Sequence, residues 1–175
     1  MTTEAHQRFE SLFRSHHQTV LNYCRRRLAP SDAEDVAADV FAVAWRRLDD
    51  VPDGEAGKAW LLAVAYKTIG NHRRGSSRRS VLGGKLDAQR HSEQETPEAR
   101  TVKEEDLHLL ASLQKLRASD QEILRLLAWD KTSHAQIGAV LGISEDAVSQ
   151  RISRARSRLK KEYEKLQIPE GAVFP

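Results

Sequence analysis

The chain has 175 residues, of which 39% are hydrophobic and 30% are charged, and its net charge at neutral pH is +3; these values are typical of a soluble globular protein with one or two small domains. It contains no run of eighteen apolar residues and no apolar segment behind a basic amino terminus, so we expect neither a membrane span nor secretion. We therefore expect the protein to be cytoplasmic. The single cysteine, Cys24, excludes an internal disulfide and a zinc site built from cysteine pairs.

The first part of the chain contains two amphipathic patterns. Apolar residues recur every three, four or seven positions over residues 9–28, which predicts a helix. A second helix is predicted over residues 32–48, with Asp32 as its amino-terminal cap. This helix carries two apolar stripes, formed by Val36, Val40, Val43 and Ala44 and by Ala37, Phe41 and Trp45. Two interpretations of the second stripe stay open: it is buried in a three-helix core, or it meets a partner protein.

A loop and a third helix follow. Residues 49–57 are rich in turn formers and predict the loop. Over residues 58–74 the pattern predicts a helix with a basic carboxyl end, whose inward positions are Trp60, Leu61, Val64, Ala65, Thr68 and Ile69. The next segment has no period and is rich in Gly, Ser, Glu and Arg, so we expect a flexible linker.

The last part of the chain predicts a second helical unit. One helix is marked by Leu107, Leu110, Leu113 and Leu116. Capping boxes are predicted for the two helices that follow, at Ser119 with Glu122 and at Ser133 with Gln136. Gly142 then ends a helix, and Ser144 caps a final helix whose inward positions are Val148, Ile152, Ala155 and Leu159. The expected fold class is therefore all-α, with two small helical domains joined by a flexible linker.

The final two helices have the pattern of a helix-turn-helix. This motif needs a small residue where its helices cross, a glycine that can take a left-handed turn, and apolar residues that hold the second helix against the first. The chain provides Gly138, Gly142 and an apolar set, which consists of Ile137, Leu141, Ile143, Val148 and Ile152. The helix-turn-helix is therefore predicted for the carboxyl-terminal domain.

The last helix of this motif is basic on its outward side. With Val148 and Ile152 inward, the residues that point outward near its amino-terminal half are Ser149, Gln150, Arg151 and Arg154. We expect these side chains to reach base edges in a major groove. Arg156, Arg158, Lys160 and Lys161 lie farther along, where they are suited to phosphate contacts.

Taken in order, four segments resemble the extracytoplasmic-function sigma factors, a group of bacterial RNA polymerase specificity subunits. FESLFRSHHQTVLNYCRRRL resembles region 2.1, DAEDVAADVFAVAWRRL resembles region 2.2, AWLLAVAYKTIGNHRR resembles regions 2.3 and 2.4, and the stretch from Leu113 to Lys161 resembles region 4. The resemblance implies a region 2 domain at residues 1–75, a linker at 76–103, a region 4 domain at 104–165 and a tail at 166–175.

The resemblance also implies roles for particular residues. Core polymerase would be gripped by Asp35, Asp39, Phe41, Trp45 and Arg46. The opened strand of the minus-ten element would be held by Lys67, Asn71, His72, Arg73 and Arg74. The minus-35 element would be bound by Ser149, Gln150, Arg151, Arg154, Arg156, Arg158 and Lys160. The implied partners are core RNA polymerase, promoter DNA and an anti-sigma factor.

Two positions depart from the family pattern. Lys67 stands in a motif where many relatives have Asn, which favours a phosphate contact over a base contact at this point. Ala38 stands where Gln is common in region 2.2, which removes one polar contact with polymerase.

Other functional classes have less support in the sequence. The histidines are scattered, and we find no HExxH motif, no glycine-rich phosphate loop and no Gly-x-Ser-x-Gly elbow, so we expect no metal, cofactor, small-molecule substrate or catalysis. A stand-alone helix-turn-helix regulator that binds duplex DNA as a dimer is the main alternative. A helical adaptor that binds only protein is the other.

Overall fold

The computed structural model describes residues 3–82 and 104–167, and all regular structure in these ranges is helical. The helices are α1 (Thr3–Arg25), α2 (Pro30–Arg46), a short 3-10 helix η1 (Leu48–Asp50), α3 (Glu55–Leu82), α4 (Glu104–Gln114), α5 (Ala118–Ala128), α6 (His134–Leu141) and α7 (Glu145–Gln167). The all-α prediction is confirmed. The chain divides into two compact units, one holding α1–α3 and the other holding α4, α5, α7 and most of α6.

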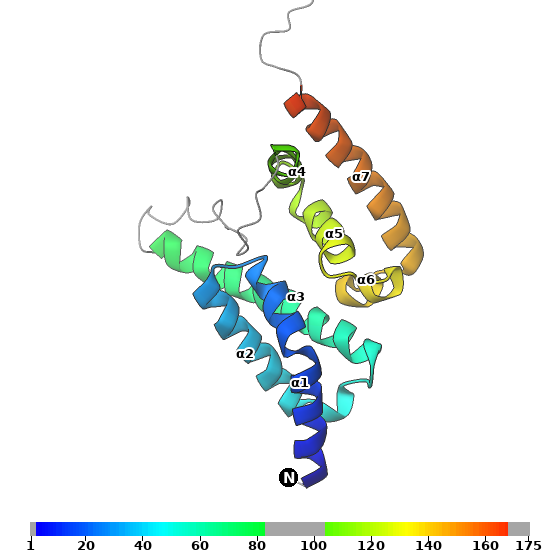
Figure 1. Cartoon of the computed structure of the whole chain (residues 1–175). Coiled ribbons are helices and arrows are strands. Elements are labelled where there is room, and N and C mark those ends of the chain that lie inside the picture. The colour runs from blue at the N-terminus through cyan, green and yellow to red at the C-terminus, as the bar shows by residue number, and fades with distance from the viewer. Residues whose placement is uncertain (1–2, 83–103, 168–175) are drawn as a thin grey trace, which may run out of the picture. The chain divides into compact units, whose positions relative to one another are not determined.

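In the amino-terminal unit α1, α2 and α3 each pack against the other two (Figure 1). The interior is mainly apolar, and its largest fully buried side chains are Val20, Tyr23, Cys24, Val36, Val40, Leu61 and Leu62. Leu62 was not among the predicted inward positions of the third helix. Burial of these side chains is the main force that holds the three helices together, at roughly 1.5–3 kcal/mol for each large apolar side chain.

Helix α2 begins two residues before the predicted start, so the prediction that Asp32 is its cap is wrong. Ala29 is the cap residue and Pro30 is the first helical residue. Proline is well suited to that position because its φ angle is already helical and its missing N–H has no partner there in any case. Asp32 lies in the first turn, where its negative charge is stabilised by the helix dipole.

Helix α3 continues to Leu82, beyond its predicted end at Arg74. The helix passes through Gly75 because a single glycine in a helix interior costs only about 1 kcal/mol relative to alanine. The first residues of the predicted linker at 76–103 are therefore helical. The rest of that linker, from residue 83, and the predicted tail from residue 168 lie outside the described residues.

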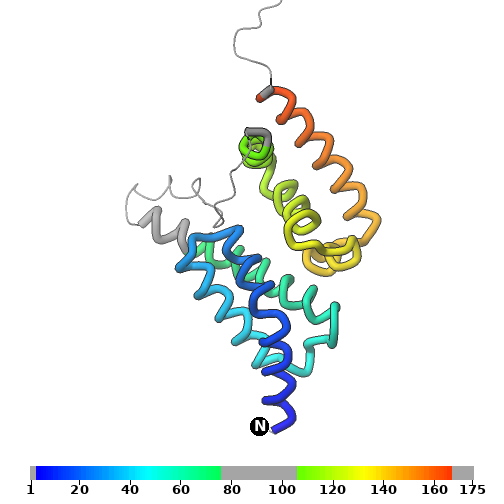
Figure 2. Tube along the Cα trace, in the orientation of Figure 1, coloured from blue at the N-terminus to red at the C-terminus, as the bar shows by residue number. Residues whose placement is uncertain are grey.

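In the carboxyl-terminal unit α7 packs against α4 and α5 (Figure 2). Of the predicted leucine stripe on α4 and the turn after it, Leu113 and Leu116 are buried, whereas Leu107 is exposed. The predicted capping box at Ser119 is wrong, since α5 begins at Ala118 and Arg117 is its cap residue, without a side-chain cap. The side-chain amide of Gln121 instead donates to the carbonyl oxygens of Gln114 and Leu116, at 3.1 and 2.8 Å.

Candidate nucleic-acid interface

The turn between α6 and α7 has the geometry of a helix-turn-helix. Helix α6 starts with a capping box, in which the Gln136 backbone N–H donates to Ser133 Oγ and the Ser133 N–H donates to Gln136 Oε1. It ends at Gly142, whose φ of 69° lies in the left-handed region that glycine adopts without strain. The Ala147 N–H donates to Ser144 Oγ at 3.3 Å and so caps α7. All three local predictions for this turn are confirmed.

Gly138 lets the turn approach the middle of α6. A Cβ atom at this position would lie 2.7 Å from the carbonyl oxygen of Ile143, which is closer than real Cβ contacts. The Ile143 N–H also donates to the Gly138 carbonyl oxygen at 3.0 Å. The prediction that a small residue is needed at Gly138 is thus confirmed, and the reason is the backbone of the turn.

The faces of α7 are divided as the sequence predicts. Val148, Ile152 and Ala155 are at most 3% exposed, and Leu159 is half-buried. Gln150, Arg151 and Arg154 are exposed on the outward side. The buried residues therefore fix the rotation of α7 and leave these three side chains in solvent.

Ser149 is held in place by a histidine that sequence reasoning missed. The Ser149 hydroxyl donates to the Glu145 carbonyl oxygen at 3.2 Å, and His134 Nδ1 lies 3.0 Å from the same hydroxyl oxygen. The contact joins α6 to α7 through side chains, and the tautomer of the imidazole sets which of the two groups donates. His134 is fifteen residues away in the chain, so only the crossing of α6 and α7 brings the pair together.

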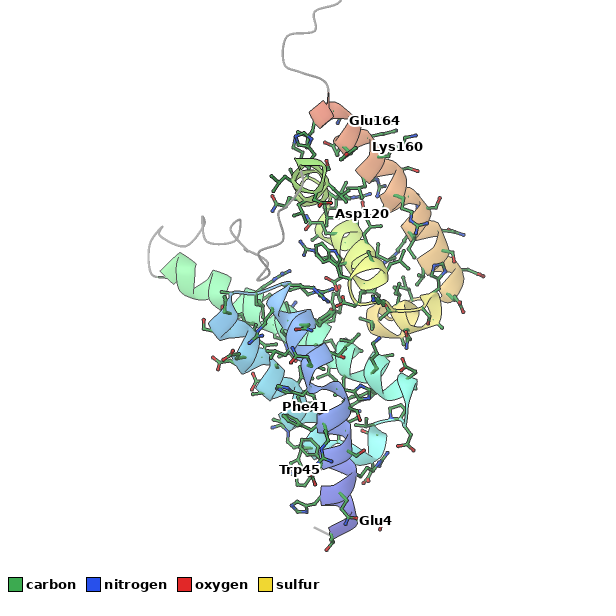
Figure 3. All side chains as sticks on the ribbon, in the orientation of Figure 1. Glu4, Phe41, Trp45, Asp120, Lys160 and Glu164 are labelled. Carbon is green, nitrogen blue, oxygen red and sulfur yellow. The ribbon has the colours of Figure 1, made fainter. Side chains whose placement is uncertain are left out.

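The basic residues farther along α7 have different surroundings. Arg156 and Lys160 are exposed, and Lys160 lies 3.8 Å from Glu164 in an exposed pair of the kind that contributes little (Figure 3). Arg158 instead forms an ion pair with Asp120, in which Nη1 and Oδ2 are 2.6 Å apart. The Arg158 guanidinium is therefore paired with a carboxylate on α5, while its side chain is 42% exposed.

The basic residues at the end of α3 also fall into two groups. Lys67, Asn71 and Arg74 are exposed, and Arg74 donates to the Asn71 side-chain oxygen. Arg73 is also exposed but donates to the carbonyl oxygen of Arg27 at 2.9 Å, and the half-buried His72 lies 3.2 Å from Asp32. These contacts link α3 to the turn after α1 and to α2.

Tyr66 was not predicted as a site residue, although it is 41% exposed beside Lys67. An exposed aromatic ring offers a surface on which a nucleic-acid base can stack. Its signal in the sequence was a lone aromatic residue next to the basic end of the third helix.

The second stripe on α2 is covered by α1. Phe41 is only 4% exposed, and its ring centroid lies 4.8 Å from that of Phe13 and 6.4 Å from that of Phe9. Trp45 is half-buried and packs on Phe9 and His6, with ring centroids 4.9 and 5.0 Å apart (Figure 3). Of the two interpretations of this stripe, burial is correct for Ala37 and Phe41. The exposed polymerase-binding candidates are Asp35, Asp39 and Arg46.

The described residues contain neither a candidate metal site nor a candidate membrane span. In residues 3–82 and 104–167, no three His, Cys, Asp or Glu side chains are grouped so that they could hold a metal ion. Over the same part of the chain, each helix is too short or too polar to cross a membrane.

Comparisons with known proteins agree with this arrangement of the helices. Residues 12–79 match the family model for sigma-70 region 2, and residues 112–161 match the model for sigma-70 region 4. The chain is 32% identical over 161 residues to the RNA polymerase sigma factor YlaC of Bacillus subtilis, covering 89% of this chain and 92% of that protein. It is 31% identical over 137 residues to the RNA polymerase sigma factor CnrH of Cupriavidus metallidurans, covering 74% of this chain and 72% of that protein.

Solved structures show the same fold. The structure of CnrH in complex with the cytosolic domain of CnrY has a TM-score of 0.62 and 25% identity, with 92% of this chain and 95% of that chain covered. The sigma factor RpoE of Bartonella quintana, solved in complex with the anti-sigma factor NepR, has a TM-score of 0.70 and 21% identity, with 91% and 98% covered. The family-model matches and the curated relatives favour a polymerase subunit over a stand-alone dimeric regulator. The chain belongs to the extracytoplasmic-function group of the sigma-70 family, the RNA polymerase sigma factors that direct core polymerase to promoter DNA.

Proposed function

We propose that the outward face of α7 reads the minus-35 element of the promoter in the major groove. The observation that carries this proposal is the exposure of Gln150, Arg151 and Arg154 opposite the buried Val148 and Ile152. Glutamine and arginine form paired hydrogen bonds with adenine and guanine edges, respectively. Ser149, oriented by His134, contacts the duplex beside them. Arg156 and Lys160 bind phosphates and set the register of the helix without reading sequence.

We further propose that the exposed face near the end of α3 holds the opened strand of the minus-ten element. Lys67 and Arg74 supply positive charge, and Asn71 supplies a polar edge. His72 and the exposed Arg73 hold the end of α3 in place through their contacts with Asp32 and the Arg27 carbonyl oxygen. Extruding a base costs a few kcal/mol, which stacking on an exposed aromatic ring such as Tyr66 offsets in part.

For core polymerase we propose a contact surface on α2 formed by Asp35, Asp39 and Arg46. The exposed part of Trp45 belongs to the same surface, whereas Phe41 supports it from below through its packing on Phe9 and Phe13. The two functional domains span residues 1–75 and 104–165, with the helical residues up to Leu82 extending the first.

Control by an anti-sigma factor is also proposed. The sigma factor RpoE of Bartonella quintana, which shares the fold, was solved in complex with the anti-sigma factor NepR. The protein acts in the cytoplasm, where promoter DNA and polymerase are found, and it contributes recognition rather than catalysis of its own. An anti-sigma factor that copurifies with the chain should abolish the transcription that the chain directs in a reaction reconstituted with core polymerase.

The test of the proposed function is transcription in vitro with purified core polymerase on a library of genomic fragments. Start-specific transcripts should appear only when both the chain and core polymerase are present, and the active fragments should share one promoter motif. Substitution of Gln150 or Arg154 by alanine should change which upstream sequences are used. A chain that binds duplex as a symmetric dimer, and that adds no start-specific transcription to core polymerase, would refute the proposal.

A further inference from the structure

Asp120, the third residue of α5, is a charged residue that is 7% exposed. A carboxylate removed from water needs charged or hydrogen-bonding partners. Its Oδ2 atom lies 2.6 Å from Arg158 Nη1 on α7 and 3.6 Å from Arg117 Nε at the start of its own helix. The pair therefore connects α5, on which Figure 3 labels Asp120, to the basic helix.

Arg158 lies on the DNA-binding helix, seven residues after Arg151. Seven residues are close to two helical turns, so both side chains belong to one stripe of α7. Arginine on such a stripe is the side chain most suited to a phosphate oxygen. The ion pair with Asp120 therefore competes with any contact between Arg158 and the phosphates of the DNA backbone.

We propose that Asp120 is a positioning residue that withholds Arg158 from the DNA backbone and fixes α7 on α5 for base reading. This inference rests on the proposed role of α7 in reading duplex DNA. Phosphate contacts strengthen binding to every sequence equally, so a withheld cation lowers the sequence-independent part of the affinity. The connection to α5 affects sequence discrimination, because base contacts require an accurately held helix. Phosphate contacts tolerate movement of the helix, so they do not depend on this connection.

The experiment measures binding of the holoenzyme, formed with core polymerase, to its most active promoter fragment and to an unrelated duplex over a series of KCl concentrations. The variants are Asp120→Asn, Arg158→Gln, their double mutant, Arg156→Gln as the matched control, and Arg151→Ala as the test of base reading. Each phosphate contact contributes about 0.9 to the slope of log affinity against log salt. Arg156→Gln should make the slope shallower by about this amount, and Arg158→Gln should leave it unchanged.

Asp120→Asn frees the Arg158 guanidinium, so the slope should become steeper by about 0.9 and binding to the unrelated duplex should become stronger. The ratio of promoter to unrelated affinity should fall, because α7 loses its connection to α5. In the double mutant the slope should return to the wild-type value, whereas the ratio should stay low. Thermal unfolding monitored by circular dichroism establishes that each variant is folded.

A slope for Arg158→Gln as shallow as that for Arg156→Gln would overturn the proposal, because Arg158 would then bind phosphate in the wild type. This comparison decides the question even if Asp120→Asn does not fold. A folded Asp120→Asn protein with the wild-type slope would also reject it. If Arg156→Gln leaves the slope unchanged and Arg151→Ala leaves promoter choice unchanged, the proposed function of α7 fails instead.

Discussion

The amino-terminal unit buries mainly apolar side chains, whereas the carboxyl-terminal unit also buries several polar and charged ones. In the first unit Tyr23, Leu61 and Leu62 are 0% exposed, and Arg27 is the one buried charged residue among the described residues of that unit. In the second unit Ser112, Asp120, Asp130 and Thr132 are all buried. Helices α4, α5 and α6 are shorter than α1, α2 and α3, so directional contacts such as the Asp120–Arg158 pair contribute more to their placement.

The two units also differ in the burial of an ion pair on the proposed DNA-binding helix. In each unit a basic residue of that helix pairs with an aspartate that is the third residue of another helix: His72 with Asp32, and Arg158 with Asp120. The Asp32 side chain is 44% exposed, whereas that of Asp120 is 10% exposed. Disruption of the more buried pair should cost more stability, because removing one partner of a buried pair leaves an uncompensated charge.

The largest expected effect tests the apolar unit. Phe41→Ala should lower the free energy of unfolding by about 3–5 kcal/mol, because the ring is buried between α1 and α2. Chemical denaturation measures this loss. Asp39→Ala, at an exposed position of the same helix, should change stability by less than about 0.5 kcal/mol and yet weaken core polymerase binding. If Phe41→Ala weakened polymerase binding without loss of stability, the packing described for α2 would be incorrect.

The next largest effect is the change in stability when a helical glycine is replaced by alanine in each unit. Gly138→Ala should lower stability by about 1–3 kcal/mol, because the new methyl group meets the Ile143 carbonyl oxygen of the turn. Gly70→Ala on α3 meets nothing closer than the end of the Arg74 side chain, at 3.6 Å. It should raise stability by up to about 1 kcal/mol through helix propensity. Thermal unfolding of the two variants should therefore shift in opposite directions, and shifts of the same sign would contradict the geometry of the turn.

A third prediction separates recognition from stability within the carboxyl-terminal unit. Arg151→Ala should remove about 1–3 kcal/mol of discrimination at one base pair of the minus-35 element, with stability unchanged, because its side chain is exposed. Lys160→Ala should weaken binding to all sequences about equally. Promoter binding by holoenzyme to single-base variants measures both, and a sequence-selective loss in Lys160→Ala would contradict this division.

The smallest effect is a pH dependence in the amino-terminal unit. Burial lowers the pKa of His16 from its ordinary value, with Glu55 opposing and Lys58 adding to the shift. The unfolded chain then binds the proton more readily than the folded chain, so stability should fall as the pH drops through about 6.5 and level off below the folded pKa. His16→Gln should remove this contribution, and denaturation midpoints at pH 7.5 and 5.5 measure it. An unchanged pH dependence in the variant would show that other groups cause it.

Local features of the carboxyl-terminal unit were predictable because they depend on neighbours within one or two helical turns. The capping box at Ser133 and the left-handed turn at Gly142 follow from residue types at fixed short spacings. The inward positions Val148 and Ile152 follow from the helical period alone. The misplaced helix starts at Asp32 and Ser119 show that a capping residue type does not by itself locate a cap.

By itself the sequence determined the helices, the helix-turn-helix and the family, since these depend on periodicity, turn chemistry and the order of motifs. Only the tertiary structure decided that Phe41 is covered by α1, that Arg158 is engaged by Asp120 and that His134 orients Ser149. Each of these contacts joins residues on different helices. Periodicity states which face of a helix is buried or polar, but the partner of that face depends on how the helices pack together.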